Sequence, residues 1–198
     1  MSNLSKKRNA IFVTVGTQLP FDRLITAIDC WAVQNSQTDI FAQVGEGSVL
    51  PFHIDSQARI SMMEFARQVA HADLLISHAG MGSIITALDL GKPIVILPRL
   101  AVQGEHRNDH QLATANKFAH IDGIYLAHNE NEIGSCIERA LAAPKRVVEG
   151  QKLSVGGARN IELINMVRKF IDGDEMQKCD VQQPVMTERN ETWENYTT

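Results

Sequence analysis

The sequence lacks the features that mark several classes of protein. It has only three cysteines, which are widely spaced and odd in number, so neither a disulfide framework nor a zinc site is expected. Acidic residues outnumber basic ones and the formal net charge is −4, which argues against a nucleic-acid partner. No apolar run approaches the roughly 20 residues that span a bilayer. There is no internal repeat either.

The N-terminal region does not have the pattern of a secretion signal. The basic run SKKR is followed by a short apolar stretch, Ala10 to Val15, which is better interpreted as a first strand. We therefore expect a cytoplasmic protein with reduced thiols. Residues 1–9 are expected to be a flexible N-terminus, residues 10–171 a single domain, and the polar, acidic residues 172–198 a disordered tail.

Short apolar runs alternate with segments of helical periodicity along the domain. This alternation predicts an α/β fold, a Rossmann-like parallel sheet with helices on both faces. The expected strands are residues 10–15, 39–44, 74–77, 93–97 and a short one around Tyr125. The expected helices are residues 20–31, 61–70, 83–90, 108–118, 130–142 and 156–171.

One stretch, Leu74 to Gln111, carries the strongest functional signal. The apolar strand LLIS is followed by the glycine turn HAGMGS, a helix from Ser83, and the strand PIVIL. Gly80 and Gly82 leave space for a ligand to approach the backbone, and a helix start attracts phosphate. The helix dipole contributes only about 0.3–2 kcal/mol, whereas a ligand held at roughly 0.1 mM needs about 5–6 kcal/mol. Further contacts are therefore expected from the polar loop at residues 99–111.

Several residues near this turn have both a functional and a structural interpretation. Gly16, Thr17 and Gln18 follow the first strand and could face a sugar or a diphosphate, or could be a plain connection to the next helix. His78 could donate to a phosphate or be satisfied by the backbone. Arg99 could neutralise diphosphate charge or be a solvated surface side chain.

Two other chemistries are weaker interpretations. His106 and His110 form an i, i+4 pair that, with Glu105 and Asp109, has metal-ligand residue types, but the pattern alone is unspecific. Ser83 lies in HAGMGSI and not in the G-x-S-x-G elbow of a serine hydrolase.

Three separated pieces, VTVGTQLPFDRLI, SHAGMGSIITALDLGKPIVILPR and DHQLATANKF, occur in this order. Together they resemble the donor-binding C-terminal half of family 28 glycosyltransferases, which have the two-domain GT-B fold. The chain is most similar to split members of that family. These are the soluble subunit of the two-subunit N-acetylglucosamine transferase of the dolichol pathway and a bacterial exopolysaccharide glucuronosyltransferase subunit.

The resemblance implies a hexosyltransferase that binds a UDP-sugar donor without an essential metal or a cofactor. It also implies a membrane-anchored acceptor-binding subunit, which brings a polyprenyl-linked saccharide acceptor, supplies the general base and recruits the chain to the cytoplasmic face of the membrane. The pathway would be exopolysaccharide or glycan synthesis. The implied donor-binding residues are Gly16, Thr17, Gln18, His78, Ala79, Gly80, Met81, Gly82, Ser83, Thr86, Arg99, Glu105, His106, Asn108, Asp109, His110 and Gln111.

Thr86 departs from the family pattern, because many relatives carry at this position a Glu that is described as binding the ribose. Thr is shorter and uncharged, and Glu105 or Asp109 could replace the missing contact. This departure supports an alternative function, a non-catalytic regulatory subunit that binds a nucleotide sugar. A sugar-nucleotide 2-epimerase has the same fold, but the chain is too short for the two domains which that chemistry needs.

Overall fold

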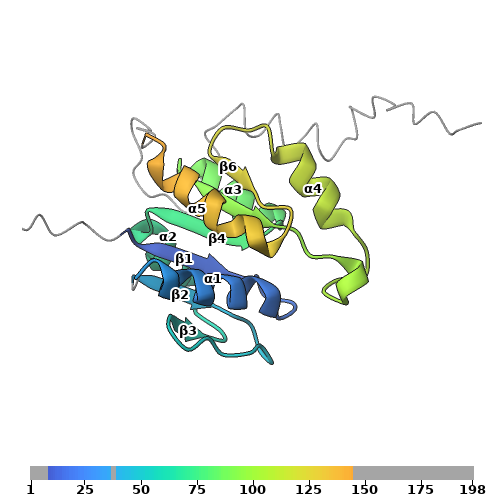
Figure 1. Ribbon diagram of the computed structural model, residues 1–198, viewed down its shortest axis with the longest axis horizontal. Coiled ribbons are helices and arrows are strands. Elements are labelled where there is room, and N and C mark those ends of the chain that lie inside the picture. The colour runs from blue at the N-terminus through green and yellow to red at the C-terminus, as the bar shows by residue number, and fades with distance from the viewer. Residues whose placement is uncertain (1–8, 37–38, 145–198) are drawn as a thin grey trace, which may run out of the picture.

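A computed structural model describes residues 9–36 and 39–144 (Figure 1). It contains one six-stranded sheet in which all neighbouring strands are parallel, in the order β3-β2-β1-β4-β5-β6. The strands are β1 (Ile11–Thr14), β2 (Ile40–Gln43), β3 (Asp55–Gln57), β4 (Leu74–His78), β5 (Ile94–Leu97) and β6 (Ile124–Leu126). The predicted parallel α/β fold is confirmed. The helix expected at residues 156–171 and both predicted termini lie outside the described residues.

Helices cover both faces of the sheet, as the alternation of strands and helices predicts. They are α1 (Asp22–Gln34), α2 (Met62–His71), α3 (Met81–Asp89), α4 (His110–Phe118) and α5 (Ile133–Ala142), with short 3-10 turns η1 (Ala101–Gln103) and η2 (Glu130–Glu132). Successive residues of β1 point to opposite faces, so Ile11 and Val13 join a core with α1 and α5, whereas Phe12 joins one with α2, α3 and α4. Figure 1 shows α1 and α5 in front of the sheet. Packing in these two cores fixes the position of the sheet edge that carries the site.

The order of the strands determines where a ligand can bind. Along the chain, the strands are added on one side of β1 as far as β3 and then on the other side from β4 onward. In open parallel sheets, ligands bind beyond the carboxyl ends of the strands where this reversal occurs. The loop after β1 and the start of α3 after β4 therefore lie on either side of this point.

Three local features differ from the sequence prediction. Strand β3 was not expected, because its residues Asp-Ser-Gln are polar and it pairs only with β2 at the sheet edge. Helix α3 begins at Met81 instead of Ser83, and α4 begins at His110 instead of Asn108. The predicted end of α3 is confirmed, because Gly91 has φ +60° and its N–H donates to the carbonyl of Leu88 at 3.1 Å.

In the described part of the chain, every helix is too short or too polar to cross a membrane.

Candidate functional site

A cleft of about 980 Å³ opens at the carboxyl ends of the strands. Its volume is at the upper end of the roughly 300–1,000 Å³ that is usual for ligand sites. One wall comes from the loop after β1 and the start of α3, and the other from the segments that follow β2 and β3. The cleft therefore lies at the reversal point between β1 and β4, where the sheet topology predicts a ligand.

The N-terminus of α3 faces this cleft and has no cap from the protein. Gly80 is the N-cap residue and has no side chain to accept a hydrogen bond from the first turn, which also contains no acidic residue. Helix α2 begins differently, because the Ser61 hydroxyl accepts the N–H of Glu64 and Glu64 adds a negative charge. Residues 80–83 all line the cleft. The first-turn N–H groups of α3, which have no acceptor within the helix, are therefore available to an anion.

His78 explains two of the glycines in this region. Its ring lies so close to Gly80 that a Cβ there would be 2.2 Å from Nε2, and a Cβ on Gly16 would be 2.7 Å from Cε1. Gly16 also has φ +80°, which favours glycine. A Cβ on Gly82 would meet nothing within 4 Å. Gly82 therefore leaves space for a ligand to approach the backbone, as predicted, whereas Gly80 and Gly16 leave space for the histidine ring.

The imidazole of His78 is held in its neutral form. Its pKa is lowered to about 4, mainly by burial and also by the positive charge of Arg99 and by His106, against a hydrogen bond with the backbone of Thr14 that raises it. The hydroxyl of buried Ser77 lies 3.2 Å from Nδ1. At neutral pH this side chain therefore enters the cleft as a hydrogen-bonding group without charge.

The depressed pKa of His78 predicts a pH dependence of stability. The unfolded chain takes up the proton near pH 6.5, whereas the folded chain takes it up only near pH 4. The free energy of unfolding is therefore fully present above pH 6.5 and falls by up to roughly 3 kcal/mol as the pH decreases toward 4. We expect His78→Asn to flatten this loss in urea unfolding between pH 6.5 and 4.5. His128→Asn, which changes an exposed histidine, is the control and should leave the loss in place.

Arg99 is a structural cation beneath the cleft. Only 2% of it is exposed, and its guanidinium donates to the carbonyls of Val15 at 3.0 Å and Leu19 at 2.7 Å and to that of Pro20. It also lies over the ring of Phe21, 4.5 Å from the centroid. Burial lowers its pKa. Its donors hold the loop after β1, and its charge reaches the cleft through space, as the pKa of His78 shows.

Glu105 also has a partner that the sequence did not suggest. Its carboxylate receives two hydrogen bonds from Arg23 of α1, both at 2.8 Å, and one from the N–H of Leu100 at 2.9 Å. Arg23 also donates to the carbonyl of Pro98 and to Glu130. Glu105 thus fixes the loop between β5 and α4 to α1, and it does not line the cleft.

The structure brings most of the predicted donor-binding residues together and separates four from the rest. The cleft is lined by Gly16, Thr17, Gln18, His78, Gly80, Met81, Gly82, Ser83, Thr86, Arg99, His106, His110 and Gln111. Ala79, Glu105, Asn108 and Asp109 do not line it. Ala79 is buried, Asn108 accepts from the ring of His110, and Asp109 accepts from the N–H of Ala101 at 2.8 Å. Neither Glu105 nor Asp109 is placed to replace the missing ribose carboxylate.

The opposite wall of the cleft was missed by the sequence analysis. Gln43 at the end of β2 is buried and links two segments: it accepts from the Thr14 hydroxyl at 2.7 Å and donates to the carbonyls of Gly16 and Ala58 at 3.0 and 3.1 Å. Further along, an exposed ion pair joins Glu46 and Arg59 at 2.9 Å. The available signal was the position of residues 43–46 at the end of the predicted strand 39–44, since parallel strands end at the same sheet edge.

The histidine pair of the β5–α4 loop stands at the mouth of the cleft. The rings of His106 and His110 meet edge to face with their centroids 4.4 Å apart, and Nδ1 of His106 is buried without a hydrogen-bond partner. Within residues 9–36 and 39–144, no three His, Cys, Asp or Glu side chains come together in a way that could hold a metal ion. Gln111 is buried nearby, and its side-chain oxygen accepts the N–H of Arg99 at 3.1 Å. The pair offers ring edges and nitrogens to a polar ligand.

Comparison with known families identifies the domain. The family model "Glycosyltransferase family 28 C-terminal domain" matches residues 10–149. The chain belongs to this family. The family 28 match covers all five helices and all six strands of the described structure, including those that form the cleft.

The family 28 chain is similar to larger proteins over a limited region. It is 34% identical over 149 residues to the UDP-N-acetylglucosamine transferase subunit ALG13 of Mus musculus, which covers 69% of this chain but 11% of that protein. For the Homo sapiens protein of the same name the identity is 30% over 161 residues, 75% of this chain and 12% of that protein. The crystal structure of Acinetobacter baumannii MurG matches with a TM-score of 0.50 and 21% identity, over 68% of this chain and 42% of that one. This likeness shows that the domain has the fold of one half of a GT-B glycosyltransferase.

Proposed function

We propose that this chain is the donor-binding subunit of a two-subunit glycosyltransferase. The donor would be UDP-N-acetylglucosamine and the acceptor a polyprenyl-linked saccharide used in glycan or exopolysaccharide synthesis. The observation that carries the proposal is the uncapped N-terminus of α3, which faces a cleft of about 980 Å³ in a family 28 domain. The names of the mouse and human relatives support the choice of donor and the role as a subunit.

The geometry supports a specific assignment of the parts of the donor to the two sides of the cleft. The N–H groups of the first turn of α3 would hold the diphosphate, with the space at Gly82 letting it approach. His106, His110 and Gln111 would contact the sugar or the ribose from the opposite loop. When the bond to the sugar breaks, negative charge grows on the departing UDP. The α3 amides and the buried charge of Arg99 would stabilise that charge in the transition state.

The second half of the active site would come from a partner. The names of the mouse and human relatives support this division, because both proteins are called subunits of a transferase. A membrane-anchored protein would supply the acceptor site and the general base and would bring this chain to the cytoplasmic face of the membrane. No residue of this chain is proposed as the base.

Transfer measured with and without the partner tests this proposal. The purified chain, a membrane-anchored candidate partner and a polyprenyl-linked acceptor are incubated with labelled UDP-N-acetylglucosamine. We expect transfer only when both proteins are present, and weaker or no transfer from UDP-glucose. Full turnover by this chain alone would contradict the two-subunit proposal.

Thr86 favours one alternative, a regulatory subunit that binds the nucleotide sugar without catalysis. Its hydroxyl donates to the carbonyl of Gly82 at 2.8 Å, so its only hydrogen is used within α3. Thermal-shift titration of the parent chain and Thr86→Glu with UDP-N-acetylglucosamine separates weak from ordinary donor binding, and the transfer assay then separates the two functions. Under the alternative, no partner restores transfer even where the donor binds.

A further inference from the structure

The connection between β2 and β3 contains no helix, although the two strands are parallel neighbours. Such strands are usually joined by a crossover of a dozen or more residues that includes a helix. Here residues 49–53 are bonded to α1 instead. Asp22 accepts the N–H of Val49 at 3.0 Å, and Asp29 accepts those of Phe52 and His53 at 3.2 and 2.8 Å. Residues 49–53 are therefore held at both ends by one helix.

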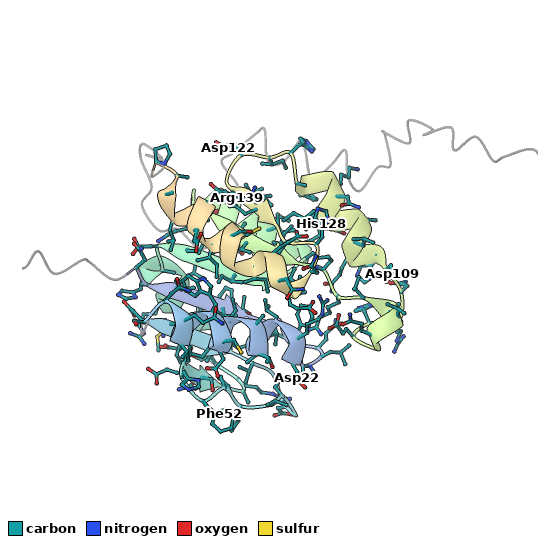
Figure 2. The ribbon with its side chains drawn as sticks, viewed as in Figure 1. Asp22, Phe52, Asp109, Asp122, His128 and Arg139 are labelled. Atoms are coloured by element: carbon teal, nitrogen blue, oxygen red, sulfur yellow. The ribbon has the colours of Figure 1, made fainter. Side chains whose placement is uncertain are left out.

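Fastening the backbone in this way turns apolar side chains outward. The exposed fractions are 58% for Val49, 64% for Leu50 and 90% for Phe52, and with Pro51 these residues form what we call the apolar segment (residues 49–52). Figure 2 shows Phe52 at the periphery of the molecule, with its ring pointing away from the sheet. Neighbouring large apolar residues that stay exposed on a fixed backbone mark an interaction site.

Asp29 is a buried charged residue that holds residues 52 and 53 against α1. Burial raises the pKa of this carboxyl, but the hydrogen bonds from the His53 ring at 3.0 Å and from the two amides outweigh burial, so the pKa lies below its ordinary value. The carboxylate is thus charged, and its hydrogen bonds hold residues 52 and 53. A surface fixed before binding loses less conformational entropy when a partner arrives.

The charges around the apolar segment favour one kind of occupant. Glu46 is paired with Arg59, so the acidic side chains that border the segment are Asp55 and Asp22, of which Asp22 accepts the N–H of Val49. An acidic border disfavours the anionic surface of a membrane. It also disfavours a second copy of the chain, because a two-fold contact would bring identical acidic borders together. The remaining occupant is a different protein with an apolar pocket and basic side chains around it.

The connection that carries the apolar segment also reaches the cleft. Gly45 and Glu46, which begin the same connection, line the cleft together with Leu19, which is 43% exposed. A Cβ on Gly45 would lie 3.6 Å from the carbonyl oxygen of Leu19, so the two loops are in contact. A protein that covers the cleft at Leu19 and Gly45 therefore meets the connection that carries the apolar segment.

We propose that the apolar segment is a docking surface for the acceptor-binding subunit, outside the donor cleft itself. This inference rests on the proposed function for the identity of the partner. Phe52 and Leu50 insert into an apolar pocket of that subunit, and basic side chains around the pocket meet Asp55 and Asp22. The donor cleft and the docking surface are separate, so a change in the segment leaves donor binding intact.

The test uses the full chain and the membrane-anchored protein that supports transfer in the assay above. For the double variant Leu50→Ser/Phe52→Ser we expect at least a tenfold weaker affinity for that protein in detergent, measured by biolayer interferometry. Binding of UDP-N-acetylglucosamine and the melting temperature should stay unchanged, because both side chains are exposed. Val33→Ser is the matched control, since Val33 is 50% exposed at the other end of α1, and it should bind as the parent does.

Three results would overturn the docking surface while leaving the proposed function intact. The first is partner affinity of the double variant equal to that of the parent. The second is binding of the parent to vesicles of phosphatidylcholine and phosphatidylglycerol that the double variant loses. The third is self-association of the parent, by sedimentation, that the double variant loses. If no membrane-anchored protein supports transfer and UDP-N-acetylglucosamine does not bind, the proposed function fails instead, and the inference falls with it.

Discussion

Replacing Arg99 with Met is expected to lower the melting temperature by roughly 10 °C or more. The substitution removes the donor from the buried carbonyl of Val15 and from the partly buried carbonyls of Leu19 and Pro20, and an unsatisfied buried group costs about 1–3 kcal/mol. We expect a total loss on the order of 3–5 kcal/mol in urea unfolding. The stability of Arg99→Lys should lie between that of the parent chain and that of Arg99→Met, because a single ammonium cannot reproduce the planar fork of the guanidinium.

A matched control and a second measurement separate this role from a general effect on the loop. Arg107 is an exposed arginine of the same loop, and Arg107→Met should change stability by less than about 0.5 kcal/mol. In addition, the charge of Arg99 helps to hold the pKa of His78 near 4, so Arg99→Met should raise that pKa. An NMR titration of His78 checks this. An unchanged melting temperature together with an unchanged His78 titration would refute the assignment of Arg99 as the cation beneath the cleft.

Gly80→Ala is expected to be the most damaging of the small changes at the start of α3. The new methyl would lie 2.2 Å from Nε2 of His78, so the ring has to move, although Gly16 already restricts it on another side. Overpacking of this kind costs about 1–3 kcal/mol. We expect a lower melting temperature and weaker donor binding, and the double variant Gly80→Ala/His78→Ala should recover part of the lost stability because the overlap is gone.

Gly82→Ala, two residues further, should behave in the opposite way in the free protein. Its Cβ meets nothing within 4 Å and its φ is not in the left-handed region, so the helix propensity of Ala should stabilise α3 by up to about 1 kcal/mol. The methyl would nevertheless stand in the cleft, where the diphosphate is proposed to approach, so affinity for UDP-N-acetylglucosamine should fall. If Gly80→Ala and Gly82→Ala were equally stable in thermal melts, the packing of His78 described here would be wrong.

The fold could be predicted from the sequence wherever apolar periodicity was strong. The runs LLIS and PIVIL, with a helical pattern between them, gave β4, α3 and β5 nearly at their observed bounds. Strand β3 could not be found in this way, because an edge strand of Asp-Ser-Gln has no apolar alternation. The start of α3 was placed two residues late, because glycines suggested a turn where Gly80 acts as the N-cap and Gly82 already lies in the helix.

The site was predictable in part, because some of its residues depend on contacts between distant segments. The glycine turn and His78 follow directly from the end of a strand. Glu105 was assigned to the ligand from its residue type, but its partner Arg23 lies 82 residues earlier in the chain and decides its role. Arg99 was likewise described as a phosphate contact or a surface side chain, whereas the fold buries it against the loop after β1. Spacing along the sequence contains no information on such partners.

The most direct test of the central claim is a ¹⁵N NMR titration of the chain with UDP-N-acetylglucosamine. We expect the largest shift changes at the amides of Met81, Gly82 and Ser83, with smaller ones in the loop at residues 16–18. The amides of α5, which lies on the opposite face of the sheet from α3, should not change. Saturable binding whose shift changes lie outside the cleft, with the amides of residues 81–83 unmoved, would contradict the assignment of the α3 N-terminus as the diphosphate site.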